Sequence, residues 1–117
     1  GRKGHRVVTM RETMFTIPCE AIFNQHPRVF RSALVGVGAK GTQTPVICIE
    51  LEKEDPEGRL DELKAELLAL GEKFEHTRSI TTILLHPRFP VDVRHNAKIG
   101  REQLAAWAED QLKRAKR

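Results

Sequence analysis

The amino-acid sequence predicts a small α+β domain, in which a β-hairpin is followed by a three-stranded sheet with flanking helices. Three long β-favouring runs occur together with two segments in which apolar residues recur at steps of three and four. A chain of 117 residues can bury a core of its own and is too short for two domains. We therefore expect one domain that uses the whole chain.

The N-terminal part of the chain predicts a hairpin and a short helix. Val7–Thr9 and Phe15–Ile17 are β-favouring runs on either side of Met10-Arg11-Glu12-Thr13, which indicates two short strands joined by a turn. Pro18 suits the first turn of a helix, and Cys19–Asn24 would continue that helix for about two turns.

The central part predicts the three-stranded sheet. Val29–Val37 and Val46–Glu52 are apolar β-favouring runs, and the glycine-containing segment Gly38–Pro45 between them indicates a hairpin loop. Ile80–Leu85 is the third run, and the helix before it predicts a crossover connection onto the same sheet. That helix is indicated by leucines that share one helical face, namely Leu60, Leu63, Leu67 and Leu70.

The C-terminal part predicts a short strand and a long helix. Phe89–Val93 is expected at a sheet edge, because Pro90 lacks the N–H group that a central strand requires. Gly100–Arg117 has the periodicity of an amphipathic helix. The residues expected on its inner face are Leu104, Trp107, Ala108, Leu112 and Ala115.

Composition excludes several classes of protein. With 39% apolar and 31% charged residues, the chain has the balance of a globular domain. No run approaches the roughly 20 apolar residues that a membrane span requires. Cys19 and Cys48 form no disulfide framework and are expected in the core, which fits a reducing, cytoplasmic compartment. No residues have metal-ligand spacing, so no metal site is predicted.

The net charge of +4 is unevenly distributed along the chain. Residues 1–31 and 94–117 each carry a net charge of +4, whereas residues 32–93 carry −4. If folding brings the two basic ends to one face, that face will attract an anion. The cluster Lys113–Arg117 is better explained as the solvated end of the last helix.

The strongest candidate for chemistry is the segment Pro90–Arg101, which places Arg94, His95, Lys98 and Arg101 within eight positions. Cationic side chains beside the free N–H groups of a helix start form a natural anion site. Lys98 can act there as a point charge on a phosphate or a developing oxyanion, and His95 as an acid or base. A turn with solvated charges is about equally compatible with these residues.

Three segments resemble the C-terminal domain of adenylate-forming enzymes, the superfamily of acyl-CoA synthetases, peptide-synthetase adenylation domains and luciferases. Residues 1–7, followed by a hairpin and Pro18-Cys19-Glu20, resemble the start of that domain. Residues 29–37 match the strand that the family writes V-x-x-A-A-V-V-G-V. Lys98 and Arg101 resemble the closing motif, in which an arginine follows a lysine by three positions. The order and spacing of these segments agree over essentially the whole chain.

The departures from the family pattern point to one branch. Gly4 stands where the family usually has Asp or Lys at a hinge, and Met10-Arg11-Glu12 replaces the usual glycines of the first hairpin. His95-Asn96-Ala97 replaces the usual Ser-Gly before the lysine. Residues 15–20 and 89–98 together look like the β-lactone synthetases of long-chain olefin biosynthesis, which are often described as fatty-acid–CoA ligases or AMP-dependent synthetases.

The resemblance implies that residues 1–117 are a single mobile C-terminal (lid) domain, beginning at a hinge formed by Lys3 and Gly4. A large N-terminal domain outside this chain would bind ATP, Mg²⁺ and the acyl substrate, and this expectation agrees with the lack of an initiator methionine. Lys98 would hold carboxylate and α-phosphate oxygens as pyrophosphate leaves. Arg2 would lie near the ATP ribose, and Arg101 and His95 would contact the nucleotide.

The function implied by the resemblance is activation of a β-hydroxy fatty acid as acyl-AMP, followed by closure to a β-lactone with release of AMP. A fatty acid–CoA ligase is the alternative, and the isolated domain is expected to be inactive in either case. Its partners would be its own N-terminal domain and other olefin-biosynthesis enzymes. A small nucleic-acid-binding module is the rival suggested by a pI near 9.4, but the chain lacks tyrosine and its β runs are chiefly aliphatic.

Overall fold

The computed structural model of the chain describes residues 6–52, 60–92 and 98–115. The α+β class is confirmed, as is a hairpin followed by a three-stranded sheet with helices. In chain order the elements are β1 (Arg6–Val8), β2 (Thr13–Phe15), α1 (Thr16–Phe23), β3 (Val29–Val37), β4 (Thr44–Leu51), α2 (Leu60–Glu72), β5 (Thr82–Leu85), β6 (Val91–Asp92), β7 (Lys98–Ile99) and α3 (Arg101–Ala115).

The central sheet has the strand order β3-β4-β5, so β3 and β5 are its two edges among the described strands. β3 and β4 form an antiparallel hairpin. Gly38 and Gly41 in its turn have φ angles of +106° and +95°, a region that glycine enters without a steric penalty. β5 pairs with β4 in parallel after the crossover through α2, as the sequence predicts.

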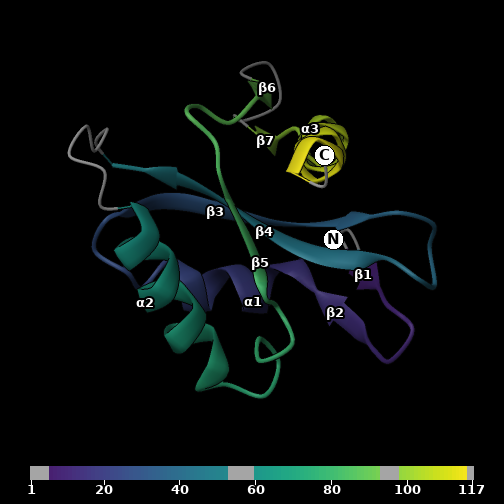
Figure 1. Ribbon diagram of the computed structural model, residues 1–117, viewed down its shortest axis with the longest axis horizontal. Coiled ribbons are helices and arrows are strands. Elements are labelled where there is room, and N and C mark those ends of the chain that lie inside the picture. Colours follow the sequence, from purple (N-terminus) through teal and green to yellow (C-terminus); the bar gives the residue numbers. More distant parts are fainter. Residues whose placement is uncertain (1–5, 53–59, 93–97, 116–117) are drawn as a thin grey trace.

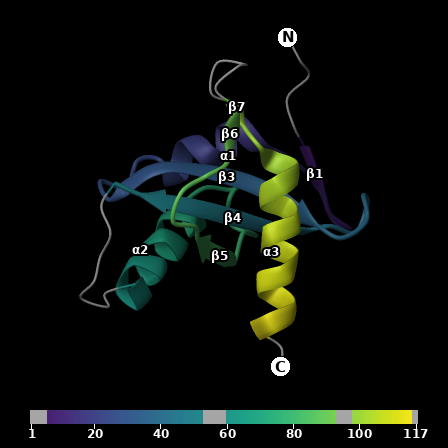
Figure 2. The same ribbon diagram turned by 90° about the horizontal axis from the view of Figure 1, so that it is seen from above.

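Helices cover both faces of this sheet. In Figure 1, α1 and α2 lie on one side of the sheet and α3 lies on the other, and Figure 2 shows α3 running across β3 and β4. The face beneath α1, α2 and the first hairpin buries Val7, Met14, Cys19, Phe23, Val29, Leu34, Ile47, Ile49, Leu63, Leu67, Ile80 and Ile83. The face beneath α3 buries Ala33, Val35, Val46, Cys48, Phe89, Leu104 and Ala108. Alternate residues of each strand therefore contribute to different cores.

The predicted edge strand Phe89–Val93 is represented by β6, which is an edge strand of a separate two-stranded sheet with β7, and Val93 lies outside the described residues. Other predicted details differ from the structure. α1 begins at Thr16, so Ile17 belongs to a helix and not to a strand, since Pro18 fits a first helical turn. Ala115 is exposed, because it lies beyond Leu112, the last residue of α3 that packs on the sheet.

Candidate functional site

The segment with the basic cluster forms a small hairpin that leads directly into α3. The backbone of Lys98 pairs with that of Asp92 in the antiparallel β6–β7 ladder. The N–H group of Gly100 donates to the carbonyl of Pro90 at 2.7 Å, which closes the base of this hairpin. Lys98 therefore lies on a strand that ends one residue before α3 begins.

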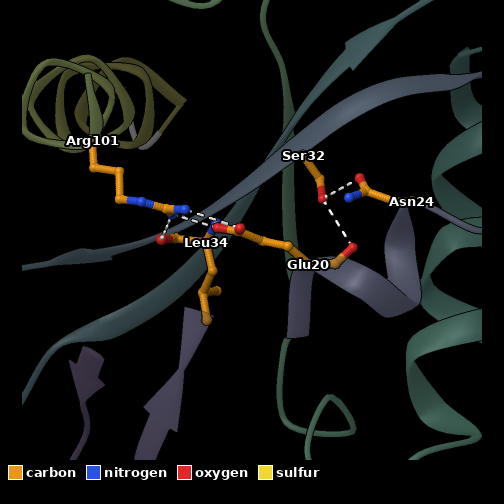
Figure 3. A network of polar contacts seen from close by, with 5 residues as sticks. All are labelled: Glu20, Asn24, Ser32, Leu34 and Arg101. Atoms are coloured by element: carbon orange, nitrogen blue, oxygen red, sulfur yellow. Dashed lines mark hydrogen bonds and ion pairs between the residues drawn. The ribbon is translucent and has the colours of Figure 1, made fainter. Parts of the chain in front are cut away.

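Arg101, the first residue of α3, forms a bidentate ion pair with Glu20 of α1 (Figure 3). Its Nη2 donates to Oε1 of Glu20 at 2.9 Å, and its Nη1 donates to Oε2. The two residues are 81 positions apart in the sequence. Their side chains are 18% and 10% exposed, so this is a mostly desolvated pair with the fork geometry that a planar guanidinium favours.

The same pair supplies hydrogen-bond partners for the backbone N–H and carbonyl of Leu34, on the side of β3 that no other described strand of the central sheet covers. The Leu34 N–H donates to Oε2 of Glu20 at 2.8 Å, and the Leu34 carbonyl accepts from Nη1 of Arg101 at 3.4 Å. Both backbone groups of one residue in an antiparallel strand point to the same side, so here they point away from β4. Glu20 and Arg101 supply the partners that a further strand would supply. They also join helices from the two faces of the sheet across its edge (Figure 3).

A further polar group binds the end of α1 to β3. The hydroxyl oxygen of Ser32 lies 3.2 Å from the carbonyl oxygen of Glu20 and 2.7 Å from Oδ1 of Asn24, the residue that follows the helix. Ser32 is buried with 2% of its surface exposed. Glu20 is therefore held to the strand by its backbone as well as by its side chain (Figure 3).

A second buried carboxylate contacts the N-terminal end of the segment that carries the basic cluster. Glu50 of β4 is 8% exposed, and its Oε1 accepts from the Phe89 N–H at 2.9 Å. Nε of Arg31 donates to the same oxygen at 2.8 Å, which compensates the charge of the carboxylate. Phe89, two residues before β6, is thus bound to the central sheet.

His86 packs in the layer between this segment and α3. Its ring meets Trp107 and Phe89 edge-on, with centroid distances of 4.5 and 5.8 Å. Burial lowers the pKa of His86, and the negative charge of Glu50 opposes this effect only in part. The Arg88 N–H donates to Nδ1 at 3.0 Å, an arrangement that fits a neutral ring.

The two thiols are core groups, as the sequence predicts, and Cys19 and Cys48 are both buried. Burial raises the pKa of Cys19 to about 11 and that of Cys48 to about 12. Such thiols stay protonated at neutral pH and are poor nucleophiles. In the part of the chain that the structure describes, no group of three or more His, Cys, Asp or Glu residues could hold a metal ion, and no helix has the length and apolar character of a membrane span.

The structure locates two of the residues that the sequence singles out. Arg101 is bound to Glu20, and Lys98 is placed by its backbone on β7. The other predicted site and hinge residues lie outside the described residues, and their roles stay predictions; they are Arg2, Lys3, Gly4 and His95.

The sequence interpretation missed Glu20 and Glu50 as parts of this region. Each is a charged residue within an otherwise apolar stretch: Glu20 precedes Ala21-Ile22-Phe23, and Glu50 follows Val46–Ile49. A buried carboxylate requires a compensating partner, so such a position was a signal that a distant cation approaches it. The sequence does not say which cation that is.

Comparison with known proteins identifies close relatives. No family model matches the chain. Olefin β-lactone synthetase of Xanthomonas campestris is 50% identical over 111 residues, which are 95% of this chain and 20% of that protein. Olefin β-lactone synthetase of Stenotrophomonas maltophilia is 45% identical over 116 residues, with 97% and 20% covered. The chain thus spans about a fifth of the length of the curated relatives that it matches.

Solved structures of adenylate-forming synthetases have the same fold. An acyl-CoA synthetase of Brucella canis superposes with a TM-score of 0.71 at 23% identity, over 97% of this chain and 20% of that one. An ATP-bound RpMatB-BxBclM chimera superposes with a TM-score of 0.74 at 18% identity, over 90% and 20%. At this level of identity the likeness concerns the fold alone. The chain is therefore a homologue of the olefin β-lactone synthetases over the part of their length that it spans, and its fold resembles that of the C-terminal domains of adenylate-forming enzymes.

Proposed function

We propose that this chain is the mobile C-terminal domain of an ATP-dependent ligase that activates a β-hydroxy fatty acid as acyl-AMP and converts it to a β-lactone. The observation that carries this proposal is the 50% identity with an olefin β-lactone synthetase over 95% of the chain. Since the chain spans 20% of that relative, we assign the main binding sites for ATP, Mg²⁺ and the acyl group to a large N-terminal domain outside it. The ATP in the structurally similar chimera supports ATP as the co-substrate.

The proposed reaction has two steps. A carboxylate oxygen of the fatty acid attacks the α-phosphorus of ATP, and pyrophosphate leaves. The β-hydroxyl oxygen of the same molecule then attacks the acyl carbon, loses its proton, and displaces AMP as the four-membered ring closes. Coenzyme A takes no part in this sequence.

Lys98 is assigned to the first step. Its ammonium group would contact the carboxylate and α-phosphate oxygens while negative charge moves between them. A preorganised cation that acts where charge develops stabilises the transition state more than the ground state, and so raises the rate. Arg2 at the hinge would contact the ATP ribose, and Lys3 and Gly4 would absorb the rotation of the domain. For His95 a contact with the nucleotide remains a prediction, whereas the ion pair of Arg101 with Glu20 competes with such a contact.

The test uses the full-length enzyme with ATP and a β-hydroxy fatty acid, with and without coenzyme A. We expect β-lactone, AMP and pyrophosphate in both reactions. If acyl-CoA forms in the reaction with coenzyme A and no β-lactone forms in either reaction, the proposal is overturned in favour of a fatty acid–CoA ligase, the alternative. ATP turnover by residues 1–117 alone would contradict the assignment of the ATP site to another domain.

The setting of the enzyme follows from the same proposal. A cytoplasmic enzyme that makes a β-lactone would be followed by one that consumes it on the way to an olefin, and we propose that enzyme as a partner. The domain itself would contact its own N-terminal domain, ATP and the acyl substrate. No role in nucleic-acid binding is proposed.

A further inference from the structure

We propose that Glu20 and Arg101 are positioning residues for Lys98: their ion pair fixes the start of α3 to the sheet and thereby sets where Lys98 is presented. This inference rests on the proposed function, in which Lys98 contacts the reacting groups. It gives Arg101 a role through Lys98 in place of a contact with ATP. It also gives a role to Glu20, a residue that no motif of the basic segment includes.

A short stretch of chain connects the ion pair to Lys98. Arg101 follows Lys98 by three positions, a stretch that spans at most about 10 Å when extended. Little of that stretch is free to move. Lys98 is in the β6–β7 ladder, and Gly100 is bound to the carbonyl of Pro90. A displacement of Arg101 therefore moves the strand that carries Lys98.

The ion pair is attached to the backbone of the central sheet. Glu20 bonds at once to Arg101 and to the N–H group of Leu34 in the middle of β3. Leu34 is 1% exposed and lies in the main hydrophobic core, so it is a rigid reference point. The pair thus ties the start of α3 to a buried residue of the hydrophobic core (Figure 3).

The guanidinium of Arg101 uses both of its terminal nitrogens within the protein. Nη1 and Nη2 both donate to Glu20, and Nη1 also approaches the Leu34 carbonyl. A phosphate that took these donors would leave the carboxylate of Glu20, 10% exposed, without its cation. An uncompensated buried charge is strongly unfavourable. The geometry therefore favours Arg101 as a permanent partner of Glu20 over a ligand of the nucleotide.

The experiment compares Glu20→Gln, Arg101→Gln, the double variant and Arg101→Lys in the full-length enzyme. We expect Glu20→Gln and Arg101→Gln each to lower kcat for acyl-AMP formation by about 10–100-fold, the effect of misplacing a reacting group by about 1 Å. The KM for ATP should change less than about twofold, and the double variant should be no worse than either single variant, because both remove one interaction. Arg101→Lys, which keeps the charge, should recover part of the loss.

A matched control is available on the same helix. Glu109 and Lys113 of α3 form an ion pair at 3.5 Å whose side chains are 50% and 72% exposed. Glu109→Gln should leave kcat and KM unchanged, since an exposed pair contributes little. A rise in the KM for ATP in Arg101→Gln that is absent from Glu20→Gln would overturn the proposal, because it would show a nucleotide contact of Arg101 alone.

Hydrogen exchange separates this proposal from the proposed function. In the substrate-free full-length enzyme, Glu20→Gln should speed exchange of the amides of Gly100 and Leu104 by at least about tenfold, because their hydrogen bonds to the carbonyls of Pro90 and Gly100 at the start of α3 open more often. Circular dichroism checks that the variant is folded. Unchanged exchange at both amides would overturn the positioning role even if the enzyme makes β-lactone. Faster exchange supports it even if the enzyme makes another acyl product.

Discussion

The N–H group of Phe89 donates to Oε1 of Glu50 at 2.9 Å, across 39 positions of sequence. Glu50 lies in β4, and Phe89 begins the segment that leads to Lys98. The end of that segment is held by the pair of Glu20 and Arg101. The segment from Phe89 to Arg101, which carries a proposed site residue, is thus bound at both of its ends to the central sheet through buried carboxylates.

Glu50→Ala is expected to lower the free energy of unfolding by about 3 kcal/mol, because it leaves the buried Phe89 N–H and the Arg31 guanidinium without their acceptor. Chemical denaturation of the 117-residue domain measures this change. Glu52, an exposed neighbour just after the strand, provides the control. Glu52→Ala should change stability by less than about 0.5 kcal/mol. Equal effects of the two substitutions would contradict the importance of the buried acceptor.

Lys98→Ala in the full-length enzyme is expected to lower the rate of acyl-AMP formation by about 10²–10³-fold, the effect of losing one preorganised charge contact. Pyrophosphate release in a single turnover measures the step directly. Lys113→Ala is the control, because Lys113 is an exposed lysine at the far end of α3. Pyrophosphate release at a near wild-type rate in Lys98→Ala would exclude the proposed role of this lysine.

His86 is expected to make stability depend on pH. Because its pKa is lowered in the folded state, the unfolded chain binds a proton first as the pH falls below about 6.5. The contribution of His86 is therefore fully present above that pH and is lost as the pH falls toward its pKa in the folded state.

His86→Asn tests this dependence, since the amide oxygen can still accept from the Arg88 N–H while the titrating group is removed. The variant should be less stable overall but should lose less stability between pH 7.5 and pH 5.5 than the wild type, as measured by urea unfolding at each pH. An identical pH dependence in the two proteins would show that other groups govern it.

Two buried threonines are expected to respond to valine with opposite signs. Thr16 is 1% exposed and its Oγ1 has no hydrogen-bond partner among the described residues. Thr77 is fully buried, and its Oγ1 donates to the Gly71 carbonyl at 2.6 Å. Thr16→Val should raise the free energy of unfolding by about 1 kcal/mol, and Thr77→Val should lower it by about 1–2 kcal/mol. Thermal unfolding of both variants side by side checks the prediction, which fails if Thr16→Val is the more harmful change.

Much of the fold was predictable because it follows from local patterns. The β3–β4 hairpin shows in two apolar runs around a glycine-rich turn, and α2 shows in leucines on one helical face. The pairing of β6 with β7 was not predictable in this way. Two strands of two residues each are too short to show the alternating pattern of a strand. They are defined by the hydrogen bond from the Gly100 N–H to the Pro90 carbonyl, which closes the hairpin.

The sequence by itself determined the fold class, the apolar faces of the two long helices and, through Lys98 and its flanking motifs, the segment where chemistry is expected. These features reside in spacing along the chain, which local preferences and the burial of apolar residues translate into structure. Only the tertiary structure decided that Arg101 is bound to Glu20, 81 positions away. A charge shows in a sequence as a residue type, but its partner depends on which buried groups the folded backbone brings within hydrogen-bond distance.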